Sequence, residues 1–294
     1  MSTITLEHLT KLYPGRAVVM AEPASVGAAF MNVFRREPGF AWRSLLVWLI
    51  PGMAMIGLTV SMQPEMSKEG SLFAAKLDMV PKEVLVAFGV QGADFGDPAS
   101  YLATNFTIYE LIGAAFAGIL GATVLAKEEA FGTGEMLYTM PVARRTVVLA
   151  KVTAGLVLVE LFAFGLAGAT FGTFAAIGVT LMRPAVVAAM FAVAGALFAT
   201  MFALGMLITV RSSRPRNATS TALGLIFGLY GINVVGALND SLAGLRALSP
   251  FRYAEAAQVV KAGGLPGGTL VLMVVALAAL AAACLLFERK EIHA

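Results

Sequence analysis

Six long apolar runs dominate this sequence and restrict what it can fold into. They lie near residues 44–62, 101–126, 146–172, 185–210, 218–238 and 268–287. A helix needs roughly 20 apolar residues to cross ~30 Å of hydrocarbon, and these runs have about that length or more. Hydrocarbon offers no partners for backbone N–H and C=O groups, and none of the runs alternates polar and apolar residues as a barrel strand does. The sequence therefore predicts an all-α membrane protein with six transmembrane helices.

The remaining composition excludes several classes of protein. Only 13% of the residues are charged, which is about half the share usual in soluble domains. The formal net charge of +3 is too small to predict nucleic-acid binding. Cys284 is the single cysteine, so neither an internal disulfide nor a thiolate metal cluster can form. The first apolar run starts well beyond the reach of a secretory signal, and we expect no cleaved signal.

The positions of Lys and Arg predict the orientation, because cytoplasmic flanks collect these residues. With a cytoplasmic N-terminus, about two thirds of the 21 basic residues fall on the cytoplasmic side. Both termini are therefore predicted to be cytoplasmic. In this orientation the basic residues left outside are Lys68, Lys76, Lys82, Arg183, Arg246, Arg252 and Lys261.

Three segments outside the runs carry helical patterns. In residues 26–43, Phe30 and Phe34 lie one turn apart beside Arg35, Arg36 and Trp42, which predicts a helix lying in the inner membrane interface. A disordered juxtamembrane tail is the alternative. The outer loop 63–100 is predicted to be partly helical. The stretch SPFRYAEAAQVVKAGG predicts a second short outer helix, with its first residue, Ser249, as N-cap.

Small residues recur at four-residue spacing inside the apolar runs. One such stripe contains Gly113, Ala117 and Gly121, and another contains Gly224 and Gly228. Small side chains let helix backbones approach closely, which stabilises helix pairs in a membrane. The stripes therefore predict close helix packing without identifying the partners.

Residues 127–145, KEEAFGTGEMLYTMPVARR, interrupt the apolar sequence between the second and third runs. A Gly-Thr-Gly turn precedes Glu135, and an acid in the first turn of a helix is favoured by the helix dipole. Pro141 then ends the helix, and Met136, Leu137 and Met140 give it one apolar side. The segment predicts a short helix on the cytoplasmic face. A solvated connector is the alternative.

The string E-x-x-x-G-T-x-E-x-L in this segment, followed by Pro141, Arg144 and Lys151, resembles the coupling segment of ABC transporter permeases of the type-2 exporter family. The six runs, residues 26–43 and the string LSPFRY (248–253) resemble that family too, over about residues 26–290. In the family, two permeases assemble with two cytoplasmic ABC ATPase subunits. The resemblance thus implies two ATPase partners and a second permease copy, identical or related. It implies these ATPase-coupling residues: Glu128, Glu129, Gly132, Thr133, Glu135 and Leu137.

The same resemblance places catalysis in another chain. No G-x-x-x-x-G-K-[ST] phosphate loop occurs in the sequence. We therefore expect a non-catalytic subunit that binds no cofactor itself, with ATP and magnesium on the partner ATPase. The resemblance also implies a location in the prokaryotic plasma membrane, in contact with lipid.

The predicted domains are a leader (1–25), the interfacial helix (26–43) and the six-span domain (44–290). The leader resembles the start of an ABC ATPase without its phosphate loop. The leader is either vestigial or misassigned, or it makes an extra contact with the partner ATPase.

Three polar residues lie deep in the apolar runs: Glu110, Glu160 and Asn233. From the rise of a helix, Glu110 lies about 13 Å below the outer end of its span and Glu160 about 22 Å above the inner end of its own. At similar depth, they are candidates to line a translocation path with Asn233, beside Tyr109. Alternatively, the carboxyl groups only fix helix packing. No Lys or Arg lies at matching depth, so no fixed ion pair is expected.

Two function classes follow. The first is the permease subunit of an ATP-driven exporter that works by alternating access. The alternative is an ion-gradient-driven transporter that uses Glu110 and Glu160 as proton sites. A membrane-embedded enzyme ranks last, because no catalytic pair or metal constellation occurs.

Overall fold

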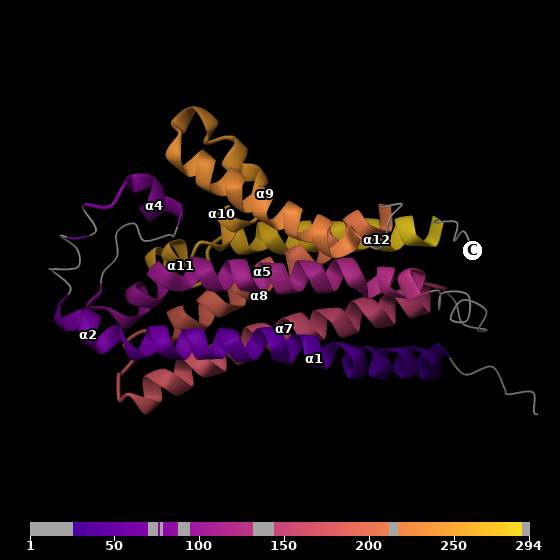
Figure 1. Ribbon diagram of the computed structural model, residues 1–294, viewed down its shortest axis with the longest axis horizontal. Helices are drawn as coiled ribbons and strands as arrows, with labels where there is room; N and C mark the ends of the chain where they lie inside the picture. The colour runs from indigo at the N-terminus through magenta and orange to yellow at the C-terminus, as the bar shows by residue number, and fades with distance from the viewer. Residues whose placement is uncertain are drawn as a thin grey trace, which may run out of the picture.

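The computed structural model describes residues 26–69, 76, 79–87, 95–131, 144–211 and 217–289, and its regular structure in these residues is entirely helical (Figure 1). Six helices are long and apolar enough to span a membrane, so the predicted all-α, six-span fold is confirmed. They are α1 (Val26–Ser61), α5 (Pro98–Phe131), α7 (Arg144–Ala176), α8 (Pro184–Arg211), α9 (Ala218–Leu238) and α12 (Gly268–Arg289).

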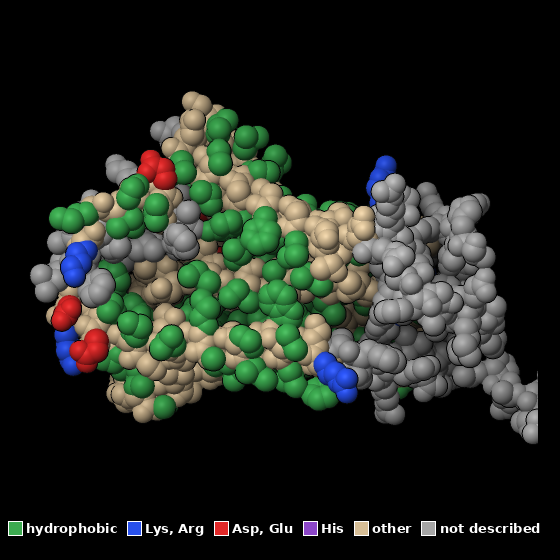
Figure 2. Space-filling model, viewed as in Figure 1, with side chains coloured by type: hydrophobic (Ala, Val, Ile, Leu, Met, Phe, Trp, Pro, Cys, Tyr) green, Lys and Arg blue, Asp and Glu red, His purple; other side chains and the backbone are tan. Residues whose placement is uncertain are grey.

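Hydrophobic side chains cover the middle of the face seen in Figure 2, and charged side chains lie toward its ends. The first helix begins, and the last one ends, at the same end of the bundle (Figure 1). An even number of spans requires this arrangement. Which side of the membrane that end faces stays a prediction.

Short elements form the opposite end of the bundle, here called the α2 end. The segment between α1 and α5 contains α2 (Gln63–Lys68) and α4 (Lys82–Ala87), so it is partly helical as predicted. The segment predicted as a second short helix is helical too, as α10 (Phe251–Ala254) and α11 (Ala256–Ala262), and its location on the outer side stays a prediction. Two 3-10 turns, η3 (Asp240–Leu242) and η4 (Leu245–Leu248), precede them.

The predicted N-cap role of Ser249 is wrong. Its hydroxyl donates a hydrogen bond of 2.8 Å to the carbonyl of Leu229, and α10 begins after Pro250 without a side-chain cap. Ser249 is fully buried. It therefore fastens the returning segment to α9 instead of starting a helix.

The helix predicted over residues 26–43 is the first part of α1, which continues without a break into the first span. Trp42 is about half exposed on its surface. The position of this part in the membrane interface stays a prediction. The predicted leader, residues 1–25, lies outside the described residues.

Helix α5 is central and packs most extensively against α8, while α1 packs against α7 and α12 against α8. The α5–α8 contact depends on glycines. A Cβ on Gly121 would lie 2.0 Å from the carbonyl oxygen of Phe202, and one on Gly113 would lie 2.1 Å from the ring of Phe198. On α8, a Cβ on Gly205 would lie 2.3 Å from a carbonyl oxygen of α5. The predicted stripe of Gly113, Ala117 and Gly121 therefore forms the seam with α8.

The start of α5 is fixed by its N-cap residue. The carboxylate of Asp97 accepts hydrogen bonds from the backbone N–H (3.0 Å) and the hydroxyl (2.7 Å) of Ser100, and Pro98 occupies the first helical position. The same carboxylate forms an ion pair with Arg183, which directly precedes α8. Asp97 thus joins the beginnings of the two most closely packed helices.

We expect Asp97 to make stability depend on pH in acid. Partial burial raises the pKa of its carboxyl, but the hydrogen bonds from Ser100 and the Arg183 guanidinium outweigh burial and bring the pKa below its ordinary value of 3.8. A carboxyl with a lowered pKa stabilises the fold above its unfolded-state pKa and loses that contribution as pH falls through the folded-state pKa. Asp97→Asn should therefore lower stability by about 1 kcal/mol near neutral pH, and this difference should shrink below about pH 4.

Thermal unfolding of the purified protein across this pH range measures the difference. Glu65→Gln is the control, because the exposed Glu65–Lys68 pair should contribute little at any pH. A difference between the native protein and Asp97→Asn that grows toward low pH would contradict the prediction.

Candidate functional site

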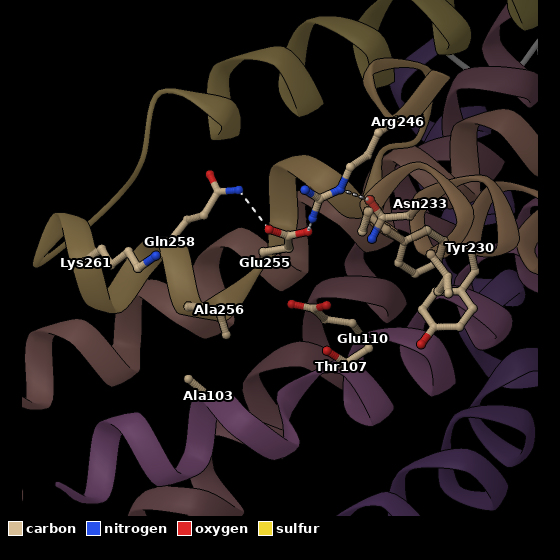
Figure 3. A pocket seen from close by; sticks show the side chains of 14 residues that line it. Ala103, Thr107, Glu110, Tyr230, Asn233, Arg246, Glu255, Ala256, Gln258 and Lys261 are labelled. Carbon is tan, nitrogen blue, oxygen red and sulfur yellow. Dashed lines mark hydrogen bonds and ion pairs between the residues drawn. The ribbon is translucent and has the colours of Figure 1, made fainter. Parts of the chain in front are cut away.

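A cavity of about 480 Å³ lies between α5, α9 and the segment from η4 to α11. Ala103, Thr107 and Glu110 face it from successive turns of α5, and Tyr230 and Asn233 face it from α9. These residues follow the spacing of three and four that places side chains on one helix face. The polar side chains that line the cavity are Thr107, Glu110, Tyr230, Asn233, Arg246, Glu255, Gln258 and Lys261 (Figure 3).

Glu110 lines the inner wall of this cavity. The residue is only 2% exposed, and its Oε1 atom has no hydrogen-bond partner among the described residues. Its carboxyl group faces that of Glu255 in Figure 3. Unpartnered polar atoms are rare in protein interiors, so Glu110 is a candidate for contact with a ligand in the cavity.

Arg246 connects two walls of the cavity. Its Nε atom donates a hydrogen bond of 3.0 Å to Oδ1 of Asn233 on α9, and its guanidinium forms an ion pair with Glu255, just before α11 (Figure 3). Gln258 donates a further hydrogen bond of 2.9 Å to the other oxygen of Glu255. The Arg246 and Glu255 side chains are each 27% exposed, so the pair is only partly solvated.

The expectation that no Lys or Arg lies at matching depth overlooked Arg246, which lines the same cavity as Glu110 and is bonded to Asn233. Among the described residues, Arg246 forms its ion pair with Glu255 and none with Glu110 or Glu160. Arg246 belongs to the connection after α9, and that connection folds back against α5 and α8. Counting rise along the spans places only span residues, so it cannot locate a side chain on a returning segment. The sequence between the fifth and sixth spans mixes charged residues with an apolar stripe. This pattern was the available sign that Arg246, Glu255 and Gln258 lie against the spans.

Two of the three predicted path residues meet in the cavity, and the third does not. Glu110 and Asn233 both line it, whereas Glu160 on α7 does not. Glu160 is partly buried against α8, where a Cβ on Gly195 would lie 2.8 Å from its Oε2 atom. Tyr109 also faces elsewhere, because its hydroxyl donates a hydrogen bond of 2.7 Å to Thr59 on α1.

The predicted coupling residues lie largely outside the described part of the chain. Gly132, Thr133, Glu135 and Leu137 fall in residues 132–143, which the structure does not describe. The backbone of Glu128 and Glu129 is helical and belongs to the end of α5. The coupling role of all six residues stays a prediction.

Two further residues of the quoted pattern are described: Arg144 is the first residue of α7, and Lys151 lies two turns further along the same helix. Lys151 is 1% exposed, and its Nζ atom donates a hydrogen bond of 3.4 Å to the carbonyl of Val124 on α5. Lys151 therefore connects the two helices that flank the predicted coupling segment.

Six spanning helices and a cavity between them define a multi-pass α-helical membrane protein. A family model described as ABC-2 family transporter protein matches residues 31–292. The chain therefore belongs to the ABC-2 transporter family and is a membrane-spanning permease subunit, as its sequence resemblance indicated. Membership implies association with ABC ATPase subunits. Comparisons with curated proteins and with solved structures give no significant match.

Proposed function

We propose that the chain is the permease of an ATP-driven exporter in a prokaryotic plasma membrane. Two copies, identical or related, assemble with two ABC ATPase subunits, which bind ATP and magnesium, and no catalysis occurs in this chain. The observation that carries the proposal is the family match across all six spans. The ion-gradient alternative gains no support, because Glu160 does not line the cavity that holds Glu110.

In this proposal, ATPase movement enters through residues 128–137 at the end of α5. The same helix carries Glu110 to the cavity, so a displacement of its end changes a cavity wall. Close packing of Gly121 against Phe202 makes α5 and α8 move together as a rigid pair. Movement of this pair against α9 and α11 would then change the side of the membrane from which the cavity is accessible.

The coupling segment supplies the test of this function. The chain is expected to co-purify with an ABC ATPase, and Gly132→Val combined with Glu135→Ala should reduce the ATPase activity of the complex to the level of the ATPase alone. The side chains of these positions are proposed to occupy a groove of the partner, where a branched residue and a lost charge weaken docking. Glu65→Gln at the α2 end is the matched control and should leave the activity unchanged. Undiminished transport after deletion of every ABC ATPase partner would exclude the proposal.

A further inference from the structure

The two acidic residues of the cavity are unequally paired. Of its two carboxylates, Glu255 is already bound by Arg246 and Gln258, whereas Glu110 Oε1 has no partner among the described residues. Lys261 lines the cavity from the exposed end of α11. The carboxyl group of Glu110 faces that of Glu255 (Figure 3), and Arg246 is already bound to Asn233 and Glu255. Glu110 Oε1 is therefore an acceptor for which the described residues supply no donor.

The remaining lining is apolar. Ala103, Val234, Ala237, Phe251 and Ala256 surround the polar residues. A volume of about 480 Å³ lies in the range of sites for small organic molecules, which run from roughly 300 to 1,000 Å³. The walls therefore suit a compound with an apolar body and one polar end.

We propose that this cavity binds an amphiphilic organic cation, with its ammonium group donating to the carboxylate of Glu110 and its apolar body against α9 and α11. This inference rests on the proposed function and names its substrate class. An ammonium group brings a positive charge and a hydrogen-bond donor to Glu110, whose Oε1 atom has no partner among the described residues. Charge-assisted hydrogen bonds of this kind are about twice as strong as neutral ones.

Other ligand classes fit the cavity less well. A metal ion needs several oxygen, nitrogen or sulfur ligands, and no group of three or more His, Cys, Asp or Glu side chains occurs among the residues the structure describes. An anion would meet two acidic side chains, while Arg246 is already bound to Glu255 and Asn233 and Lys261 lies at the exposed end of α11. An uncharged compound would offer Glu110 only a neutral hydrogen bond, which is weaker than a charge-assisted one.

The test uses three probes that differ only at one end: 4-phenylbutylamine, 4-phenylbutanol and 4-phenylbutanoate. Their binding to the full-length protein in nanodiscs, without an ATPase, is measured by titration calorimetry. The amine is expected to bind at least about tenfold more tightly than the alcohol, and the carboxylate most weakly. Glu110→Gln should abolish the preference for the amine, whereas the matched variant Glu160→Gln should keep it.

A second variant keeps the test decisive if Glu110→Gln does not fold. Ala237→Leu narrows the cavity without touching the carboxylate, and it should weaken the amine and the alcohol alike. Equal binding of amine and alcohol to the native protein, a preference that survives Glu110→Gln, or unchanged binding to Ala237→Leu would each overturn the inference. Because no ATPase is present, this result is independent of the co-purification test, and either proposal can fail alone.

Discussion

Replacing Gly121 by alanine is expected to destabilise the protein by about 3 kcal/mol or to prevent its folding. The added Cβ would lie 2.0 Å from the carbonyl oxygen of Phe202, and its next contacts are also backbone atoms of α8. A backbone cannot rotate away as a flexible side chain can, so α5 and α8 would have to separate. Thermal unfolding of the detergent-purified protein measures the loss.

Gly224→Ala is the matched control for this prediction. Gly224 also lies within a long helix, α9, but a Cβ there would meet nothing within 4 Å. Alanine forms helices more readily than glycine, so stability should stay the same or rise slightly. Similar unfolding temperatures for the two variants would mean that the α5–α8 seam is not closely packed.

Replacing Arg246 by methionine is expected to cost about 2 kcal/mol of stability. Methionine keeps much of the side-chain volume, but Glu255 loses its ion pair and Asn233 loses a hydrogen bond. Two partly or fully buried carboxylates would then face each other in the cavity without an intervening cation, which is unfavourable. The unfolding temperature measures the loss, and an engineered cysteine at the exposed residue Ala257 would report looser packing of α11 by faster labelling.

A double variant separates the ion pair from general packing. Arg246→Met combined with Glu255→Gln should recover most of the lost stability, because the unpaired charge is then removed. Arg252→Met is the matched control on the same segment, since its described contact is the ring of Tyr253, 5.9 Å from the guanidinium carbon. If the double variant is as unstable as Arg246→Met alone, the ion pair is not what holds this segment.

The apolar runs predicted the six spans because the length of hydrocarbon to be crossed sets the length of the run. The sequence also predicted close packing at the glycine stripe on α5, since close backbone approach requires small residues at helical spacing. The helix that packs against this stripe could not be predicted, because hydropathy does not distinguish a neighbouring helix from lipid. Glu110 and Asn233 were correctly grouped by depth.

The estimate of depth grouped Glu160 with Glu110 and Asn233, but Glu160 does not line their cavity. Helical rise gives the position of a residue along its span, but not the direction in which its side chain points around the helix. Glu160 points toward Gly195 on α8, away from the cavity. Arg246 and Glu255 were missed for a different reason, because their positions depend on how a connection folds back on the spans. That tertiary contact has no periodic signature in the sequence.

Two consecutive residues of α5 face different partners. Tyr109 is bonded to Thr59 on α1, and Glu110 faces the cavity. Any turn of α5 about its own axis large enough to withdraw the carboxyl would break the tyrosine bond on the other side. The hydrogen bond between Tyr109 and Thr59 therefore fixes the orientation of Glu110. In the proposed function, a molecule bound at Glu110 is released by movement of α9 or α11 and not by rotation of α5.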